Sequence, residues 1–491
     1  MDNLNKLLHR YRGQISNGSD MHWSARELRE QTNTWSAHLA QHHLPGYAVG
    51  VLMDNGPHWL ALDFACAKQG IALVPLPDFF GLDQLLHLVN EGAISTLVTD
   101  RPTLAQQLGF HAHAQDLLAP MPTLRRTPSC PALPAQLRKI TFTSGTTGAP
   151  KGVCLSEATL LAVAEGLCAA TQTLRIHTHL CLLPLPVLLE NIAGVYAPML
   201  ANANIICPPQ AKVGLEGSSK FDPQQCLNAI GEYMPHSIIM LPQTLAALLS
   251  VAQVKDPRLA SLKLVAVGGG KVPKPLLELA AAHGLPVYEG YGLSECGSVV
   301  CLNTPEARKQ GTVGQALQGV ELKLADDGEL MIRGRRLDGY LHEIRQADTH
   351  PFKDADWLAT GDLARIDDEG FVEITGRKKN LIITAFGRNI SPEWPEQILL
   401  ETGAFLQAVV YGDAQAHLAA VLVARPGMGQ THIETAIRIA NLQLPDYGQI
   451  RAWVTAPQAF GPHNQLTTAN GRLRREAIYA RYGKQLFGEP A

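Results

Sequence analysis

The chain has 491 residues, of which 41 are Lys or Arg and 44 are Asp or Glu, so its formal net charge at pH 7 is −3. Hydrophobic residues make up 46% of the chain and charged residues 17%, which excludes a largely disordered protein. The near-neutral charge argues against a nucleic-acid binder or a protein bound to anionic membranes, because both need a basic surplus. At roughly 150 residues per domain, the length predicts two to four compact units.

The N-terminal segment and the cysteines favour a cytoplasmic location. The first twenty residues, MDNLNKLLHRYRGQISNGSD, lack the apolar stretch of a signal peptide. Nine cysteines are scattered along the chain without a CxxC spacing, as expected for reduced thiols. The uncharged stretch 191–209 contains Pro198, Asn202 and Asn204, and its apolar runs are too short to cross about 30 Å of hydrocarbon. We therefore expect no integral membrane segment, but a buried helix followed by a short strand.

Strand and helix patterns alternate in the first part of the chain. A helix is predicted over 24–42, opened by Ser24 as its cap with Glu27 three positions on. Apolar runs then predict a strand, a helix, and further strands, at 48–54, 58–70, 71–76, 94–100, 237–242, 263–269 and 286–292. Such alternation implies crossover connections and a parallel sheet covered on both faces. The Pro-rich segment 118–136 is predicted to be a surface connection.

After about Gly311 the pattern changes to antiparallel pairs. Two hairpins are predicted, at 319–334 around Asp327-Gly328 and at 364–376 around Glu369-Gly370. Strands at 408–413 and 419–425 and a helix near 432–442 follow. This is enough for a separate small α+β domain of about 110 residues.

The segment ITFTSGTTGAPKGV, residues 140–153, has the composition of a polyphosphate-binding loop. An apolar strand leads into glycines that let the backbone turn its N–H groups toward an anion. Hydroxyl groups add donors and Lys151 adds a mobile positive charge. The loop is not a Walker A motif, because GxxxxGK[ST] is absent. The candidate phosphate-binding residues are Thr143, Ser144, Gly145, Thr146, Thr147, Gly148 and Lys151.

The sequence TSGTTGAPKG resembles the glycine-rich loop of the adenylate-forming (ANL) superfamily, which includes acyl-CoA synthetases, aryl-CoA ligases, luciferases and adenylation domains. Four further segments resemble family motifs in the family's order: YEGYGLSE (288–295), WLATGDL (357–363), GRKKNLIITAFGRNISPEWPE (376–396) and LTTANGRLRR (466–475). The hinge segment and LPLPVLLENIAGVY (183–196) are most similar to bacterial long-chain fatty acyl-CoA synthetases.

This resemblance implies the fold and the reaction. The expected fold is α/β, with a large N-terminal domain (1–378) of stacked αβ subdomains plus a small β-barrel, and a small mobile α+β domain (379–491). A carboxylate would attack the α-phosphorus of ATP to give an acyl-adenylate and pyrophosphate, and a thiol would then release AMP. The implied cofactors are ATP, Mg²⁺ and coenzyme A, or the phosphopantetheine of a carrier protein.

The resemblance also implies roles for individual residues. Thr143 and Glu295 would bind magnesium, a cation that prefers oxygen ligands. Ser294 would bond the α-phosphate, and Asp362 and Arg377 would bind the ribose. The residues expected to frame the adenine are Gly269, Gly270, Glu289, Gly290, Tyr291 and Gly292. Lys379 would be the hinge, and Gly387 would line the thiol tunnel after domain rotation.

Two departures from the family pattern affect the expected chemistry. Arg472 stands where most members have a lysine that bridges the carboxylate and ATP, and arginine differs from lysine in shape and donor geometry. Pro186 and Val187 stand where many relatives have an aromatic residue or His. An apolar Val187 is consistent with an alkyl substrate and equally with simple core packing. The catalytic residues we expect are Lys151, Ser294, Glu295 and Arg472.

The leading hypothesis is an AMP-forming ligase that activates a medium- or long-chain fatty acid and transfers it to coenzyme A. One alternative is delivery to a separate acyl carrier protein, since no carrier domain is evident before Ala491. Another is a non-catalytic nucleotide-binding relative, suggested by Arg472. A dinucleotide-dependent dehydrogenase is a distant fourth, because VGGGKVP (267–273) matches GxGxxG poorly.

Overall fold

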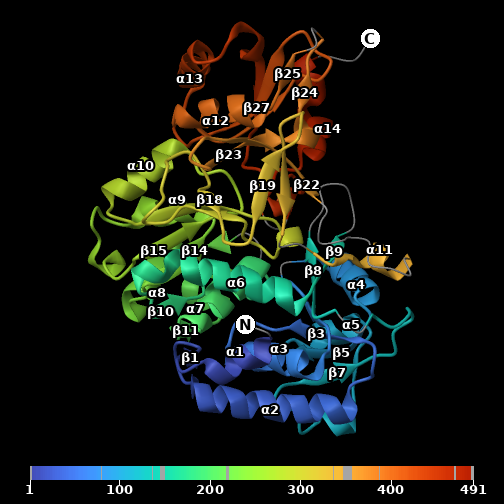
Figure 1. Ribbon diagram of the computed structural model, residues 1–491. Helices are drawn as coiled ribbons and strands as arrows, with labels where there is room; N and C mark the ends of the chain where they lie inside the picture. The colour runs from blue at the N-terminus through green and yellow to red at the C-terminus, as the bar shows by residue number, and fades with distance from the viewer. Residues whose placement is uncertain are drawn as a thin grey trace.

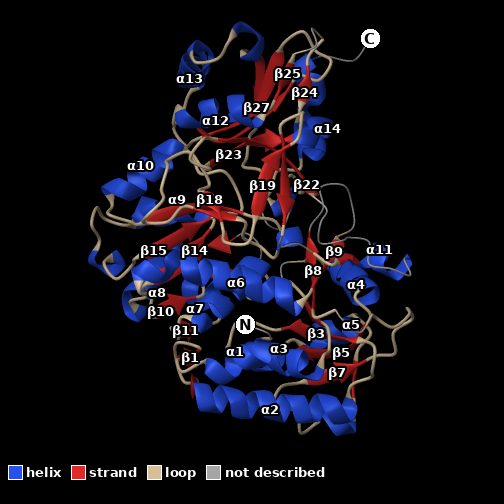
Figure 2. Cartoon of the chain, viewed as in Figure 1, coloured by secondary structure: helices blue, strands red, loops and turns tan. Residues whose placement is uncertain are grey.

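The computed structural model describes residues 3–78, 80–134, 137–143, 150–216, 220–334, 337–346, 357–385, 388–468 and 471–487. A large N-terminal domain of layered sheets and helices carries a small C-terminal domain at one end (Figure 1). Helices and strands alternate through the layers of the large domain (Figure 2). The predicted α/β class, with one large and one small domain, is therefore confirmed.

Among the described residues, the first large sheet has the order β21-β9-β8-β4-β3-β5-β7-β6. Its central strands β8, β4, β3 and β5 are parallel, as predicted, whereas both edges are antiparallel. Its strands are β3 (Ala48–Leu52), β4 (Leu73–Pro75), β5 (Ile94–Thr99), β6 (His111–Ala112), β7 (Thr123–Arg125), β8 (Lys139–Thr143), β9 (Lys151–Leu155) and β21 (Gly339–Tyr340).

The second large sheet has the order β18-β17-β16-β15-β14-β10-β11-β1-β2. Strands β16 to β1 in this order are parallel, and β17, β18 and β2 add antiparallel edges. Its strands are β1 (Gln14–Ser16), β2 (His22–Ser24), β10 (Thr178–Leu180), β11 (Asn204–Ile206), β14 (Ser237–Met240), β15 (Leu264–Val267), β16 (Val287–Tyr291), β17 (Cys301–Leu302) and β18 (Gln315–Ala316). A two-stranded ribbon, β12 (Leu215–Glu216) and β13 (Lys220–Phe221), lies outside it.

Helices between and outside the two sheets create three hydrophobic cores. The largest core lies between the sheets and includes Trp35, Trp59 and Tyr196. It is built on α1 (Leu4–Arg10), α2 (Ala25–His42), α3 (Pro57–Gln69), α6 (Glu157–Thr171), a π-helical turn (Glu190–Tyr196) and α7 (Ala197–Leu200). The other face of the first sheet is covered by α4 (Leu82–Glu91) and α5 (Pro102–Gln107), and α11 (Leu341–Gln346) lies near the edge of that sheet. The other face of the second sheet is covered by α8 (Pro223–Tyr233), α9 (Pro242–Val251) and α10 (Lys274–Ala282).

Local sequence signals explain several of these elements. Ser24 caps α2: its Oγ accepts from the N–H of Glu27, and Glu27 Oε2 accepts from the N–H of Ser24 at 2.7 Å. The stretch 191–209 forms the π-helical turn, α7 and β11, all within the large domain. No described helix combines the length and the apolarity that crossing a membrane requires. All nine cysteines are free; Cys130 and Cys168 are half-buried and the others are buried.

Both predicted hairpins form and together make a four-stranded antiparallel sheet of order β19-β20-β22-β23. Its strands are β19 (Glu321–Leu324), β20 (Glu329–Arg333), β22 (Leu358–Ile366) and β23 (Val372–Arg377). Gly328 and Gly370 each have φ of 83°, the left-handed turn conformation that glycine adopts without strain. Backbone bonds from Val313 to Val372 and from Val372 to Gly314 join this sheet to the neighbourhood of β18.

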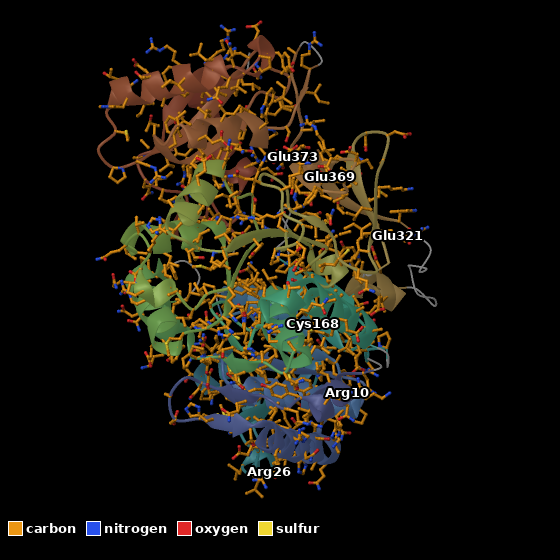
Figure 3. The ribbon with its side chains drawn as sticks, turned by 60° about the vertical axis from the view of Figure 1, so that its left-hand side comes forward. Arg10, Arg26, Cys168, Glu321, Glu369 and Glu373 are labelled. Carbon is orange, nitrogen blue, oxygen red and sulfur yellow. The ribbon has the colours of Figure 1, made fainter. Side chains whose placement is uncertain are left out.

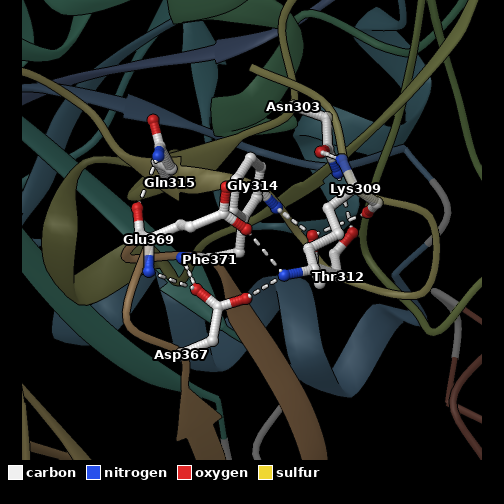
Figure 4. Close-up of polar contacts among 8 residues, drawn as sticks. All are labelled: Asn303, Lys309, Thr312, Gly314, Gln315, Asp367, Glu369 and Phe371. Atoms are coloured by element: carbon white, nitrogen blue, oxygen red, sulfur yellow. Dashed lines mark hydrogen bonds and ion pairs between the residues drawn. The ribbon is translucent and has the colours of Figure 1, made fainter.

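An exposed polar cluster fixes the β22–β23 turn to the loop after β17 (Figure 4). Lys309 Nζ lies 2.6 Å from Asp367 and 2.9 Å from Glu369. Asn303 continues this link into the second sheet, since its N–H donates to the carbonyl of Glu289 at 2.9 Å. The four-stranded sheet therefore has a fixed position beside β16.

The C-terminal domain has its own cores, formed by residues from Ile382 onward. It contains β24 (Ile382–Ile383), β25 (Asn389–Ile390), β26 (Phe405–Tyr411), β27 (Leu418–Ala424), β28 (Ile450–Thr455), α12 (Glu393–Glu401), α13 (Gln430–Leu442) and α14 (Arg475–Phe487). Glu369 and Glu373 of the β22–β23 hairpin lie near its junction with the large domain (Figure 3). The exact boundary at Lys379 remains a prediction.

A buried ion pair lies at the start of β8, the strand that leads to the predicted phosphate loop. Lys139, on β8, and Asp63, on α3, are 2% and 3% exposed. Lys139 Nζ donates to Asp63 at 2.9 Å, to Asn191 at 2.5 Å and to the Tyr196 hydroxyl at 2.9 Å. Burial lowers the pKa of Lys139, and the Asp63 carboxylate opposes that shift. This pair joins the strand, the helix layer and the π-helical turn.

Replacing Asp63 by Ala leaves the Lys139 ammonium buried without its carboxylate. We expect the free energy of unfolding to fall by about 3–5 kcal/mol, as for other broken buried pairs, measured by urea denaturation. The double variant Asp63→Leu/Lys139→Met removes both charges and should regain at least half of the loss. A double variant as unstable as Asp63→Ala would contradict this account.

Candidate active site

Two residues of the predicted phosphate loop are described, at its two ends. Thr143 ends β8 and Lys151 begins β9, and they are direct partners in the antiparallel register. Thr143 is half-buried and Lys151 is exposed. The other predicted loop residues, Ser144, Gly145, Thr146, Thr147 and Gly148, lie outside the described residues. The structure thus places one hydroxyl and one ammonium group at the mouth of the loop.

The segment predicted to frame the adenine forms the end of β16 and the turn after it. Gly290 pairs with Leu302, and Tyr291 with Cys301. A Cβ on Gly292 would lie 1.5 Å from the carbonyl oxygen of Ser298, so only glycine fits there. Gly269, with φ of 79°, and Gly270 follow β15, and an added Cβ on the preceding Gly268 would lie 3.4 Å from the carbonyl of Gly290. These two glycine-containing loops therefore lie side by side, as predicted.

A buried carboxylate in the middle of β22 connects the four-stranded sheet with β16 of the second large sheet. Asp362 is 3% exposed, and its two oxygens have different partners. Tyr291 donates its hydroxyl to Oδ2 at 2.7 Å, and Arg377 Nε lies 2.7 Å from Oδ1. Arg377 is also the cross-strand partner of Asp362 in the β22–β23 pair. Burial raises the pKa of Asp362, and the neighbouring guanidinium opposes the shift.

Glu295 lies in a 3-10 turn (Ser294–Cys296) directly after the adenine segment. Its Oε1 accepts from the hydroxyl of Tyr340 at 3.0 Å, and Lys151 Nζ lies 5.5 Å from the centre of the Tyr340 ring. Tyr340 therefore links Glu295 to the mouth of the phosphate loop. The motifs missed this residue; the one available signal was an aromatic side chain at the end of the charged segment GRRLDGY (334–340). Ser294 is half-buried in the same turn.

Arg472 reaches the site from the C-terminal domain. Its backbone is fixed by a turn in which the N–H of Thr468 donates to the Arg472 carbonyl at 2.7 Å. The side chain is exposed, yet burial among the surrounding groups lowers its pKa, and the nearby Arg377 lowers it further. The carboxylates of Asp362 and Glu295 act in the opposite direction. The guanidinium of Arg472 therefore interacts electrostatically with Arg377, Asp362 and Glu295 of the large domain.

Glu289, on β16, is one of the residues predicted to frame the adenine, and its side chain is buried. It is 8% exposed, and burial raises its pKa to about 7. The cations of Arg308 and Lys271 partly oppose this shift. Lys271 directly follows Gly270. Burial lowers the pKa of Lys271, and nearby carboxylates, chiefly those of Glu373 and Glu401, oppose this shift.

The remaining predicted positions are less informative. Lys379 is exposed, in a 3-10 turn (Lys378–Asn380) that follows β23. Gly387 lies outside the described residues. Val187 is half-buried, one turn before Glu190, which is fully buried and pairs with His179 at 2.8 Å. Cys181 lies beside that pair, but the His179 and Glu190 side chains have hydrogen-bond partners within the protein. We assign this group to packing.

The chain is similar in sequence to a known enzyme family and to several CoA ligases. A family model described as AMP-binding enzyme matches residues 8–342. A 2-succinylbenzoate–CoA ligase of Bacillus pumilus is 29% identical over 417 residues, which cover 80% of this chain and 80% of that protein. FadD15, a long-chain-fatty-acid–CoA ligase of Mycobacterium bovis, is 25% identical over 536 residues, which cover 90% and 87%.

Solved structures show the same fold. The anthranilate CoA ligase AuaEII, in complex with anthranoyl-AMP, superposes with a TM-score of 0.81 at 19% identity, covering 98% of this chain and 97% of that one. MenE from Bacillus subtilis, in complex with ATP and magnesium ion, gives a TM-score of 0.77 at 24% identity, covering 96% and 98%. The large and small domains found here are therefore those of a known architecture.

The raised pKa of Glu289 predicts a specific pH dependence of stability. The folded protein keeps a proton that the unfolded chain releases, so the free energy of unfolding should fall as pH rises through about 7. Between pH 6 and 8 this carboxyl group should account for a loss of about 1 kcal/mol, and Glu289→Gln should remove that part of the slope. Denaturant titrations at both pH values measure it. Glu278→Gln, at an exposed position on α10, is the control; an unchanged slope in Glu289→Gln would contradict the assignment.

Proposed function

The chain belongs to the AMP-binding enzyme family, and from this premise we propose that it joins a carboxylic acid to coenzyme A through an acyl-adenylate. Its named relatives are CoA ligases. ATP would supply the adenylyl group, and Thr143 and Glu295 offer the oxygen donors that magnesium prefers. Lys151, Ser294 and Arg472 would stabilise the negative charge that develops on the phosphate oxygens, and Arg472 would also hold the attacking carboxylate in place.

The observation that carries this proposal is the convergence of charge around Asp362. This buried carboxylate is bonded by Tyr291 and Arg377, two residues that the motifs assign to the nucleotide. Arg472 adds a cation from the other domain within the same electrostatic environment. In our proposal Asp362 and Arg377 bind the ribose hydroxyls, and the glycine-containing loops at 268–270 and 290–292 receive the adenine ring. Arg472 then faces the phosphates.

For the acid we propose a medium- or long-chain fatty acid. Val187 is apolar where many relatives have an aromatic residue or His. Nearby, Leu189 and Ala193 are half-buried and pack against the core between the two large sheets. The similarity to FadD15 over 90% of the chain supports an alkyl substrate. The similarity to 2-succinylbenzoate–CoA ligases supports an aromatic acid instead, so both classes belong in the substrate screen.

The direct test is pyrophosphate release with ATP and magnesium against a panel of fatty acids of different length, 2-succinylbenzoate and simple aryl acids. We expect AMP and an acyl-CoA thioester as products, with the highest kcat/KM for an alkyl acid. Replacing coenzyme A by purified acyl carrier protein tests the alternative acceptor. Turnover restricted to aryl acids would overturn the fatty-acid assignment, and absence of AMP with every acid would overturn the proposed reaction.

Arg472→Ala should separate the two half-reactions. Removing a cation that acts only on the developing charge typically costs about 10²–10³ in rate, so adenylate formation should fall by that factor. Conversion of supplied acyl-adenylate to thioester should change much less, because the mixed anhydride between the acid and AMP is already formed. Arg474→Ala is the matched control, since Arg474 is exposed, two residues away, and bonds only the Gln465 carbonyl among the side-chain contacts described. Equal pyrophosphate exchange in Arg472→Ala and Arg474→Ala would defeat the role of Arg472.

A further inference from the structure

Glu329 bonds the residues adjacent to the Asp362–Arg377 pair. Asp362 and Arg377 face each other across β22 and β23. Gly361 precedes Asp362, and its N–H donates to Glu329 Oε1 at 2.8 Å. Lys378 follows Arg377, and its Nζ donates to Glu329 Oε2 at 2.6 Å. A single carboxylate on β20 therefore connects the backbone next to the predicted ribose-binding residue with the side chain next to the predicted hinge.

The side chain of Glu329 is held in one position because it is buried and both of its oxygens are hydrogen-bonded. Glu329 is 7% exposed, and each of its oxygens has a partner. Lys378 also reaches Asp327 at 2.6 Å, so its ammonium lies between two carboxylates of the β19–β20 hairpin. These bonds raise the pKa of Lys378, and the ammonium stays charged at neutral pH. Gly361 has φ of 72°, the left-handed conformation that favours glycine, at the irregularity in the β20–β22 pairing beside Glu329.

We propose that Glu329 and Lys378 are positioning residues that hold the large-domain end of the hinge and tie it to the ribose-binding turn. This inference rests on the proposed function and deepens it. Since Lys378 is anchored to the β19–β20 hairpin, the backbone up to Lys378 belongs to the large domain. Rotation of the C-terminal domain then begins at Lys379, and the path of Arg472 to the nucleotide is fixed by this anchor.

The chain contains a matched control for the chemistry of the anchor. Lys309 also bridges two carboxylates, Asp367 and Glu369, at 2.6 and 2.9 Å, and its pKa is raised for the same reason. Lys309 is 44% exposed and Lys378 47%. The Lys309 cluster bonds the turn between β22 and β23 (Figure 4), whereas Lys378 directly follows the last residue of β23. Removing either lysine deletes an equivalent ion pair, but only Lys378 lies at the hinge.

The test compares Lys378→Met, Glu329→Gln and the rescue variant Lys378→Arg with Lys309→Met in the full-length protein. We expect Lys378→Met and Glu329→Gln to lower kcat for thioester formation about fivefold, because every complete cycle requires domain rotation. Single-turnover adenylate formation and KM for ATP should stay within about twofold. Lys378→Arg should recover most of kcat, and Lys309→Met should match the wild type. Hydrogen exchange of the amides at 378–385 should be faster in Lys378→Met than in the wild type. In Lys309→Met it should stay unchanged.

These measurements separate failure of the anchor from failure of the proposed reaction. If the wild type forms no AMP with any acid, the proposed function fails, and hydrogen exchange still tests the anchor. If the wild type is active and Lys378→Met matches Lys309→Met in kcat and in exchange, the anchor is overturned. Equal losses in adenylate formation and thioester formation, with a raised KM for ATP, would also overturn it, since they indicate damage at the ribose site alone.

Discussion

The buried carboxylate of Asp362 is the group on which the rest of the candidate site depends. A carboxylate with 3% exposure is stable only if partners compensate its lost hydration. Tyr291 and Arg377 supply those partners, one from the nine-stranded sheet and one from the adjacent strand of the four-stranded sheet. The end of β16 must therefore lie against the middle of β22. The backbone bonds that join Val372 to Val313 and Gly314 serve the same alignment from the other side.

The sequence predicted well those features that depend on neighbouring residues. The Ser24–Glu27 capping box, the turns at Gly328 and Gly370 and the apolar strands all arise from interactions a few residues apart. Motif resemblance predicted that residues 291, 362 and 377 would share a site, and the structure brings them into contact. The role of each at a nucleotide remains a proposal.

Other features lay beyond sequence reasoning because they join residues far apart in the chain. The antiparallel sheet edges depend on pairings such as β21 with β9, which no local pattern specifies. Lys139 and Asp63 are separated by 76 positions, and neither lies in a recognisable motif. Tyr340 and Glu329 were missed for the same reason: their importance comes from the group they meet, Glu295 in one case and Lys378 in the other.

The burial of the cysteines has a chemical consequence for an enzyme of this kind. An acyl-adenylate is an electrophile that any nearby thiolate could intercept. Cys154, on the strand that begins at Lys151, and Cys301, the partner of Tyr291, lie on the strands that form the site. Burial raises the pKa of both thiols to about 12, so both stay protonated and poorly nucleophilic. Burial thereby keeps these two sulfur atoms from competing with the incoming acceptor for the activated acyl group.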